Sequence, residues 1–540
     1  MRNIEIPYVE ERGKRYRFFE MLPGLISWSI LALPFVLSQV NPRLCVFFIL
    51  GYLLLWFAKA VGLDIRAIQG YRMINQHQKL PWPQMLQELS TGKTEQPDRH
   101  IPAWHYENVI RVHEQPTPIK ADEIVHAVMI AAYNESREVL EPTIKSVLAS
   151  DYDMKKVILV MAYEGRDGAQ SEEAVKQLVE KYGGRFMHTL AFKHPETPGE
   201  ILGKGGNVTF AGRGLEEYIA TTKIKPLNVI VTTLDSDNRP HKYYLSALSY
   251  LYAATTDPRY VSYQPVPIYT NNIWDAPAPM RVIATGNSFW NIVLSMRTHM
   301  IRNFSAHAQS LQTLIDTDYW SVRTIVEDGH QFWRTYFRYD GRHEVYPLYV
   351  PIFQDAVLSN TYWKTLKAQF IQLRRWAWGA SDVAYVAEKG FFTPNDVPKT
   401  DLILKFGRLL EGHVTWAVAP LILTFSSFIP RLLNAHDLGR TGFATIQLPL
   451  IASRIQTVAM VGIVITLFLS IKMLPPKPER YKRRRTIFMM LQWVMLPVTT
   501  IAYNSLSALY SQTRLMFGKY IGKFDVTDKA VVTEDRKTIL

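Results

Sequence analysis

Cysteine is the scarcest residue of this chain, and Cys45 is its single example among 540 residues. One cysteine excludes an intramolecular disulfide framework, so nothing requires the chain to face an oxidising compartment. The fourteen histidines form no H-x-x-x-H or H-x-H pattern paired with cysteine, which argues against a zinc site. The glycine-rich segment 203–207 lacks the P-loop pattern, and no internal repeat or low-complexity tract is present.

Charged side chains are absent from several long apolar runs, which argues against a wholly soluble protein. The first two, 22–40 and 44–58, are joined by the turn-like Asn-Pro-Arg of residues 41–43. Each approaches the ~20 residues that a helix needs to cross ~30 Å of hydrocarbon, so we predict a transmembrane hairpin. Three further charge-free runs follow near the C-terminus, over 412–430, 455–471 and 486–513.

Positive charge is in excess, with a formal net charge of +13. The densest stretch, 472–485, holds seven basic residues and one acidic residue between two apolar runs. Lysine and arginine at that place are typical of a cytoplasmic loop. The stretch carries no interleaved base-stacking aromatics, so we expect a lipid bilayer and no nucleic acid as partner. We predict a multi-pass protein of the plasma (inner) membrane, with its large middle region in the cytoplasm.

The pattern divides the chain into four segments. The first, 1–61, holds a basic N-terminus and the hairpin, and the second, 62–401, contains no spanning run and is the expected cytoplasmic domain. Residues 402–513 form transmembrane or re-entrant helices, and 514–540 form a cytoplasmic tail. A helix over 362–386, rich in large apolar residues and poor in acids, is expected at the membrane interface.

The middle segment alternates short β-branched runs with helix-like stretches, which predicts βαβ units and a mostly parallel, Rossmann-like sheet. Ligands bind beyond the carboxyl ends of the strands in such sheets, so chemistry is expected there. The expected strands are 124–132, 156–162, 185–192 and 228–234, and the expected helices are 137–149, 170–181 and 208–222.

Two carboxylates, Asp235 and Asp237, follow the last of these strands directly. In extended chain, residues two apart point the same way, so both can converge on a hard divalent cation. Such a metal would neutralise a diphosphate leaving group. The alternative is a solvated turn, because Asp-Ser-Asp-Asn is also good turn chemistry.

A second acidic pair, Glu327 and Asp328, lies between a strand-like apolar pair and the helix-like 331–337. A carboxylate at such a junction can reach into a cleft as a general base, or it can cap the helix. On the helix 362–386, Gln372, Arg375 and Trp376 share one face at i, i+3 and i+4. The arginine suits phosphate and the tryptophan suits a sugar ring, although both are also at home at a membrane interface.

In this order the three motifs resemble those of the processive family-2 glycosyltransferases, the cellulose, chitin and hyaluronan synthases. The resemblance covers about 124–380, and it extends to the tail through a motif similar to the F-x-V-T-x-K gating loop of bacterial cellulose synthase. After the second strand the family's aspartate pair is missing, and Glu164 or Asp167 is expected to substitute for it.

The resemblance implies a GT-A-type fold, a nucleotide-sugar donor, Mg²⁺ or Mn²⁺ as cofactor, and inverting transfer to a glycan acceptor, with UDP as the expected nucleotide. It implies Asp328 as the catalytic base beside Glu327, and Trp376 at the acceptor. The remaining implied residues are Asp235 and Asp237 for the metal; Tyr133, Asn134, Glu135, Glu164, Lys204, Asn207, Asp235, Gln372 and Arg375 for the donor; and Phe524, Val526, Thr527 and Lys529 for the gating loop.

Other functions remain open at this point. Transfer of one sugar to a lipid-linked acceptor competes with polymer synthesis, because few spans are available to enclose a channel. A transporter would need ionisable residues within its spans, and a sugar-nucleotide sensor would not need Asp328. The gating-like motif needs the cytoplasm, so we interpret 486–513, interrupted by Pro497 and Asn504, as a re-entrant hairpin or interfacial helix rather than a span.

Overall fold

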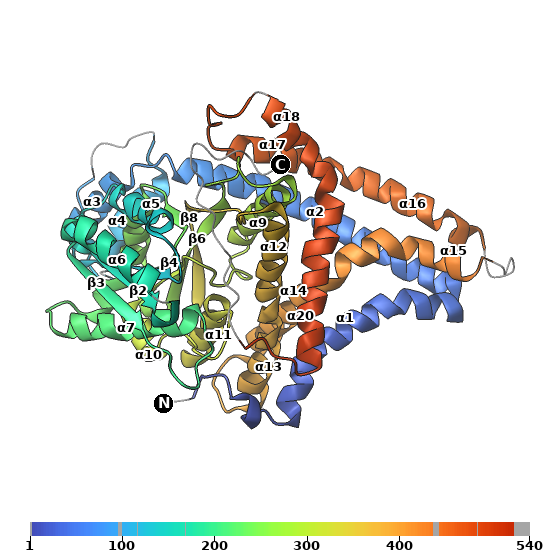
Figure 1. Cartoon of the computed structure of the whole chain (residues 1–540), viewed down its shortest axis with the longest axis horizontal. Helices are drawn as coiled ribbons and strands as arrows, with labels where there is room; N and C mark the ends of the chain where they lie inside the picture. The colour runs from blue at the N-terminus through green and yellow to red at the C-terminus, as the bar shows by residue number, and fades with distance from the viewer. Residues whose placement is uncertain are drawn as a thin grey trace.

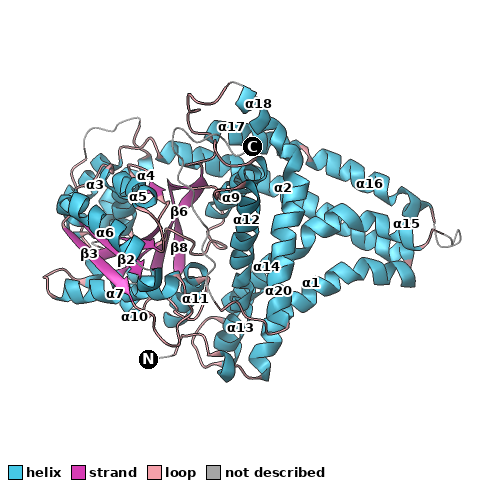
Figure 2. Ribbon diagram, viewed as in Figure 1, coloured by secondary structure: helices cyan, strands magenta, loops and turns pink. Residues whose placement is uncertain are grey.

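The computed structural model describes residues 3–94, 100–115, 117–167, 169–435, 442–482 and 484–522. All its strands gather in one α/β domain, and long apolar helices extend away from that domain (Figures 1 and 2). The gating-like motif, with Phe524, Val526, Thr527 and Lys529, lies outside the described residues.

The α/β domain is built on one eight-stranded sheet in the order β3-β2-β1-β4-β7-β6-β8-β5. Strands β3, β2, β1 and β4 are parallel, as predicted, and β6 and β8 run the same way because the short β7 lies antiparallel between β4 and β6. Six carboxyl ends therefore share one edge. The strands are β1 Val125–Ala132, β2 Val157–Glu164, β3 His188–His194, β4 Val229–Asp235, β5 Arg239–Pro240, β6 Val261–Tyr269, β7 Ala308–Ser310 and β8 Glu344–Gln354.

Both faces of the sheet are buried, which explains the continuous apolar runs of its strands. Val128 and Ile130 of β1 face one core, which α5 (Arg137–Leu148) covers, and Ala127 and Met129 face the other, which α7 (Lys204–Ala220) covers. Each fully buried aliphatic side chain of this kind contributes about 1.5–3 kcal/mol. Further helices of the domain are α3 Trp82–Thr91, α4 Ala103–Glu114, α6 Ala169–Tyr182, α8 Tyr244–Ala254, α9 Ala278–Ser295, α10 Leu311–Asp316, α11 Glu327–Arg338, α12 Tyr362–Ala377 and α13 Asp382–Ala387.

Two expectations about these helices are wrong in detail. No strand precedes the acidic pair; α11 instead begins at Glu327 itself. The helix expected over 362–386 is interrupted by a 3-10 turn, Trp378–Ser381, between α12 and α13. Glycine at position 379 weakens the helix there, because it has more backbone freedom to lose than any other residue.

In the described part of the chain, five helical segments are long and apolar enough to cross a membrane: Lys14–Val40, Pro42–His77, Lys399–Leu433, Thr445–Met473 and Arg484–Met516. They comprise α1 Lys14–Val40, α2 Pro42–His77, α14 Lys399–Phe425, α15 Ile429–Leu433, α16 Phe443–Ala459, α17 Val461–Met473, α18 Arg484–Leu491, α19 Leu496–Thr499 and α20 Leu506–Met516. The predicted arrangement of an α/β domain between apolar helices is confirmed.

Arg484–Met516 is one continuous helical run, so the expected re-entrant hairpin is wrong. Pro497 lies in the first turn of α19, where its missing N–H costs nothing, and a π turn over Thr500–Ser505 takes the chain past Asn504 without reversing it. Figure 1 shows α1, α2, α14 and α16 reaching toward α15, whereas α20 crosses their course beside α12. Because Arg484–Met516 is also long and apolar enough to cross a membrane, the interfacial alternative stays a prediction.

A polar contact fixes α20 against the other helices. Ser27 of α1 donates to Gln512 Oε1 at 2.7 Å, and Gln512 Nε2 donates to the carbonyl of His413 in α14 at 2.8 Å. A Cβ on Gly24 would lie 3.0 Å from the carbonyl oxygen of Gln512, so glycine permits the close approach of α1 and α20. Small residues and interhelical hydrogen bonds are the usual means by which apolar helices associate.

Candidate active site

The polar residues singled out from the sequence gather at the carboxyl edge of the sheet. Asp235 ends β4, Glu164 ends β2, and Tyr133 follows β1. Asn207, in the first turns of α7, donates to the carbonyl of Ala162 at 3.0 Å and thereby ties α7 to the end of β2. The residues predicted from the sequence therefore lie together at the edge of the sheet where ligands bind in such folds.

Lys204 stands at the centre of this site. Its Nζ lies 2.9 Å from Asp235 Oδ1, 3.1 Å from Asp328 Oδ2 and 3.8 Å from Glu327 Oε1. Burial by itself would lower the pKa of Lys204, but the carboxylates of Asp235, Asp328 and Glu327 outweigh it and raise that pKa. The ammonium thus stays charged and joins β4, α7 and α11.

Two glycines allow α7 to begin so close to its neighbours. A Cβ on Gly205 would lie 2.5 Å from the carbonyl oxygen of Ser321, and a Cβ on Gly206 would lie 2.5 Å from Glu200 Oε2. Real Cβ atoms do not approach the backbone so closely, so a side chain at position 205 would push α7 away and move Lys204 from the carboxylates. At position 206 the opposing atom is the end of the flexible Glu200 side chain, which can move aside, so the packing requires glycine most at position 205.

The acidic pair occupies the first turn of α11. The N-cap is Val326, so the alternative that Asp328 caps the helix is wrong. Glu327 is 2% exposed. Burial, together with the charge of Asp328, raises the pKa of Glu327 to about 8 despite Lys204 and Arg375. The side chain of Asp328 is 19% exposed, so of the two carboxylates it is the one that reaches solvent.

Arg375 brings a second cation to the site from α12. Burial lowers the pKa of its guanidinium, and the charges of Glu327, Asp235 and Asp328 oppose that shift. Trp376, the next residue, lies beside Tyr269 at the end of β6, with ring centroids 6.4 Å apart.

The remaining motif residue of α12 has a local partner. Gln372 Oε1 accepts a hydrogen bond from Gln369 Nε2 at 3.1 Å within the same helix. The structure therefore brings Arg375 and Trp376 of this motif to the sheet edge, and Gln372 bonds along its own helix.

Asp235 and Asp237 present carboxylate oxygens at one strand end, and Ser236 between them points elsewhere and donates to Glu135 Oε1 at 2.8 Å. Asp235 also accepts from the hydroxyl of Ser305, and Asp237 Oδ2 accepts from the backbone N–H of Asp355 at 3.3 Å. In the described residues no group of three or more His, Cys, Asp or Glu side chains could hold a metal ion. Two carboxylates fit Mg²⁺ or Mn²⁺ where substrate phosphates complete the coordination.

The residues predicted for the nucleoside lie on the β1–β2 side. Arg166 stacks over the ring of Tyr133 at 4.4 Å, and its Nε lies 3.2 Å from Glu164 Oε2. Asn134 has a left-handed φ of 58°, and Glu135 accepts from the backbone N–H of Tyr133. Glu135 therefore also shapes the turn after β1.

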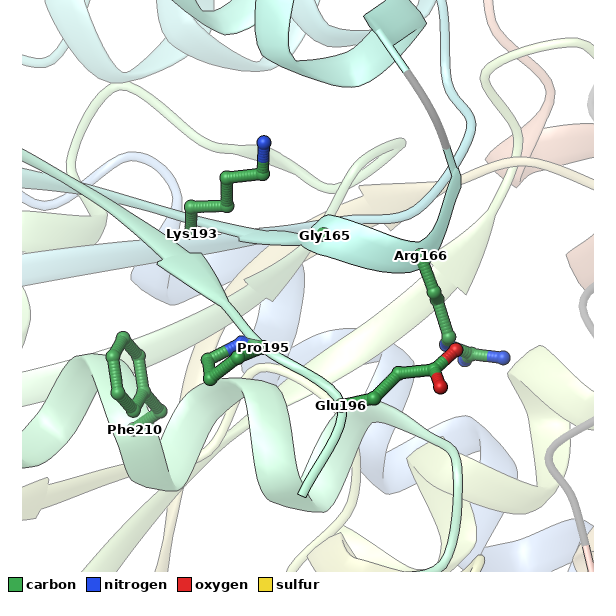
Figure 3. Close-up of a pocket in the computed structure, with 6 residues that line it drawn as sticks. All are labelled: Gly165, Arg166, Lys193, Pro195, Glu196 and Phe210. Carbon is green, nitrogen blue, oxygen red and sulfur yellow. The ribbon is translucent and has the colours of Figure 1, made fainter.

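A cavity of about 490 Å³ opens next to this group, at the ends of β2 and β3. Figure 3 shows Arg166 and Glu196 on one side of it and Phe210 of α7 on another. The cavity lies beside the residues predicted for the nucleoside and does not include Lys204. Along the same edge of the sheet, the described residues thus form a cavity at the ends of β2 and β3 and a cluster of charged side chains around Lys204. Its lining consists of Gly165, Arg166, Lys193, Pro195, Glu196 and Phe210.

Sequence reasoning missed three residues that complete the site: Tyr269, Ser305 and His307. Tyr269 is the last residue of an unpredicted strand, β6. Ser305 and His307 belong to the loop 296–307 before β7 and contact Asp235 and Asp328 respectively. No sequence motif marks that loop, so Ser305 and His307 carried no local signal.

The sequence matches no protein-family model and no curated protein. Solved structures similar to the chain include the mannosyltransferase PcManGT from Pyrobaculum calidifontis in complex with GDP-Man and Mn²⁺, at 13% identity, covering 82% of this chain and 99% of that chain, with a TM-score of 0.37. Another is TarS 1–349 from S. aureus, at 11% identity, covering 74% and 93%, with a TM-score of 0.36. TarS 1–349 in complex with UDP-GlcNAc matches at 13% identity over 74% and 93%, with a TM-score of 0.33. The first of these neighbours is named as a mannosyltransferase, and the third is bound to UDP-GlcNAc.

Proposed function

We propose that this chain is a membrane-bound, inverting glycosyltransferase that moves a sugar from a nucleotide-sugar, with UDP as the expected nucleotide, to a glycan acceptor. The observation that carries the proposal is the convergence on Lys204 of carboxylates from β4 and α11, with Arg375 of α12 beside them. Displacement of a diphosphate requires cations that offset its charge and a carboxylate that can take a proton. Lys204, Arg375 and the partly exposed Asp328 supply these groups at one edge of the sheet.

Asp328 is the proposed general base. A sugar hydroxyl is a poor nucleophile near neutral pH, so a base that takes its proton is worth ~10²–10⁴-fold. The acceptor oxygen then attacks the anomeric carbon while the bond from that carbon to the diphosphate oxygen breaks. Of the two carboxylates of the pair, Asp328 suits this role better. Glu327 is buried, and the raised pKa of Glu327 leaves Glu327 mostly protonated at neutral pH.

Lys204 and Arg375 meet the negative charge that grows on the leaving diphosphate. Preorganised cations in a partly dry site stabilise such charge more than water does. A divalent ion held by Asp235 and Asp237 would neutralise further charge on the diphosphate. Trp376 and Tyr269, adjacent at the end of β6, offer flat faces against which an acceptor sugar can stack.

The proposed topology keeps donor and site on the cytoplasmic side. If Arg484–Met516 lies along the interface beside α12, then the N-terminal segment, the domain 62–401 and the tail 514–540 all face the same compartment. The basic loop 472–485 favours the cytoplasm as that compartment. The same arrangement would allow the gating-like motif to act on the site.

Polysaccharide synthesis is the first candidate reaction, because the three motifs occur together. One observation favours the second candidate, single transfer to a lipid-linked acceptor: the described residues contain five apolar helical segments, which are few to enclose a channel for a growing polymer. The two candidates differ in the length of the product.

The test is incubation of the purified protein in detergent, with Mn²⁺ and a panel of UDP- and GDP-sugars. We expect release of one nucleoside diphosphate, and a product whose new bond has the opposite anomeric configuration to the donor. Polymeric product supports the synthase, and a singly glycosylated lipid supports the second candidate. No turnover of any donor, or retained configuration, would contradict the proposal.

A further inference from the structure

His307 contacts Asp328, the proposed base, although no sequence motif identifies this histidine. It is 1% exposed, and its Nδ1 lies 3.5 Å from Asp328 Oδ1 and 2.9 Å from the carbonyl oxygen of Phe304. On the other side of the ring, the indole N–H of Trp320 lies 3.2 Å from Nε2. Both ring nitrogens therefore have defined partners.

The indole fixes the tautomer of this histidine. A tryptophan N–H only donates, so Nε2 must accept and the proton of the neutral ring sits on Nδ1. That Nδ1–H donates to the carbonyl oxygen of Phe304, and Asp328 Oδ1 lies farther from Nδ1, at 3.5 Å, which is a close contact and not a hydrogen bond. Burial lowers the pKa of His307, against the opposing charge of Asp328, which favours the neutral form.

The backbone places this loop for contact with both carboxylates. Ala306 adopts φ 69°, a left-handed conformation that is costly for a residue with a Cβ. On either side of it, Ser305 donates to Asp235 and His307 faces Asp328. Strain of this kind persists where surrounding contacts hold it, and here those contacts are the site's own carboxylates.

We propose that His307 is a positioning residue: its neutral ring is held by hydrogen bonds to Phe304 and Trp320, lies in contact with the carboxylate of Asp328 and thereby limits where that carboxylate can sit. The inference rests on the proposed function, because it gives Asp328 the role of base. Lys204, Glu327 and Arg375 are the charged or titratable groups around the same carboxylate. A neutral partner adds direction without a further positive charge, which would weaken Asp328 as a base.

Substitutions separate orientation from packing. His307→Asn keeps an N–H donor near the place of Nδ1, whereas His307→Leu keeps volume and loses the donor. We expect His307→Leu to reduce kcat by about two- to tenfold, the scale of the one neutral hydrogen bond that holds the ring to Phe304, with donor KM within about twofold of wild type. His307→Asn should recover most of that loss. His188→Asn, at a histidine that stacks on Tyr218 at the far edge strand, is the matched control and should match wild type.

Trp320→Phe tests the tautomer without touching the histidine. It removes the indole donor, so we expect an added inflection in the acid limb of the pH–kcat profile. Wild-type kcat in both His307→Leu and Trp320→Phe would overturn the proposal. A loss in His307→Leu that appears mainly in donor KM would also overturn it.

A spectroscopic measurement keeps this inference distinct from the proposed function, because it needs no turnover. In protein with ¹⁵N-labelled histidine rings, the difference between wild type and His307→Asn should be one neutral Nδ1–H ring. A neutral Nε2–H ring or an imidazolium in that difference would overturn the proposal even if sugar transfer is observed.

Discussion

Replacing Lys204 by methionine tests whether this ammonium holds the site together. Methionine keeps the length and most of the apolar volume but removes the charge, so Asp235, Asp328 and Glu327 would face one another without a cation between them. Removing one partner of a buried ion pair typically costs about 3–5 kcal/mol. The side chains of Asp235 and Asp328 are 33% and 19% exposed, so water screens part of that cost and we expect about 2–3 kcal/mol.

The assay is thermal unfolding of the purified protein in detergent, with donor and metal absent. Lys193→Met is the matched control, because Lys193 pairs with Glu172 at the surface, with side-chain exposures of 48% and 46%. A surface pair of that kind contributes about 1 kcal/mol or less. Adding Asp235→Asn to Lys204→Met should recover part of the loss, since it removes one of the carboxylates that the ammonium had balanced. If Lys204→Met unfolds no earlier than Lys193→Met, the account of the cluster is wrong.

Three further predictions follow from the same structure. Burial raises the pKa of Glu327 from 4.5 to about 8 in the folded state. The stability that this shift contributes is therefore complete below about pH 4.5 and is lost as pH rises through about 8. Glu327→Gln should make the melting temperature depend less on pH over that range, and an unchanged pH profile would contradict this. Excess chelator should abolish sugar transfer, and added Mn²⁺ should restore it. Full activity in excess chelator would contradict the proposal that Asp235 and Asp237 hold a metal ion needed for transfer. In a Cys45→Ser background, Lys482→Cys should react with an impermeant thiol reagent only from the cytoplasmic side and Arg43→Cys only from the other, and the reverse would invert the topology.

The first half of the sheet could be predicted from the sequence because its signals are local. Strands β1, β2 and β4 are continuous apolar runs with helices between them, and each boundary lies within two residues of expectation. The carboxyl-edge rule then places Asp235 at the site, since it depends only on strand direction.

The second half could not be predicted, because non-local pairing defines it. β7 is three residues long and is held between β4 and β6 by antiparallel bonds that no local pattern announces. His307 enters the site only through that pairing, so its relation to Asp328 is invisible in sequence. For the same reason the environment of Glu327, which sets its pKa, depends on Lys204, 123 positions earlier in the numbering.

The course of Arg484–Met516 shows a different limit. Pro497 and Asn504 are correct signals of an irregular helix, but local sequence does not distinguish a reversal from a π turn that continues the helix. Packing of α20 on α1, α12 and α14 decides between them, because those contacts bury one continuous face.

The central claim is that Asp328 is the base for glycosyl transfer, and turnover of Asp328→Asn tests it most directly. Asparagine keeps the size of the side chain but cannot take the acceptor's proton. Asp318→Asn is the control, because Asp318 is a surface residue, paired with Arg213, whose side chain is 75% exposed. We predict that Asp328→Asn lowers kcat at least about a hundredfold while donor binding and the control stay near wild type. Turnover by Asp328→Asn within a few-fold of wild type would contradict the account.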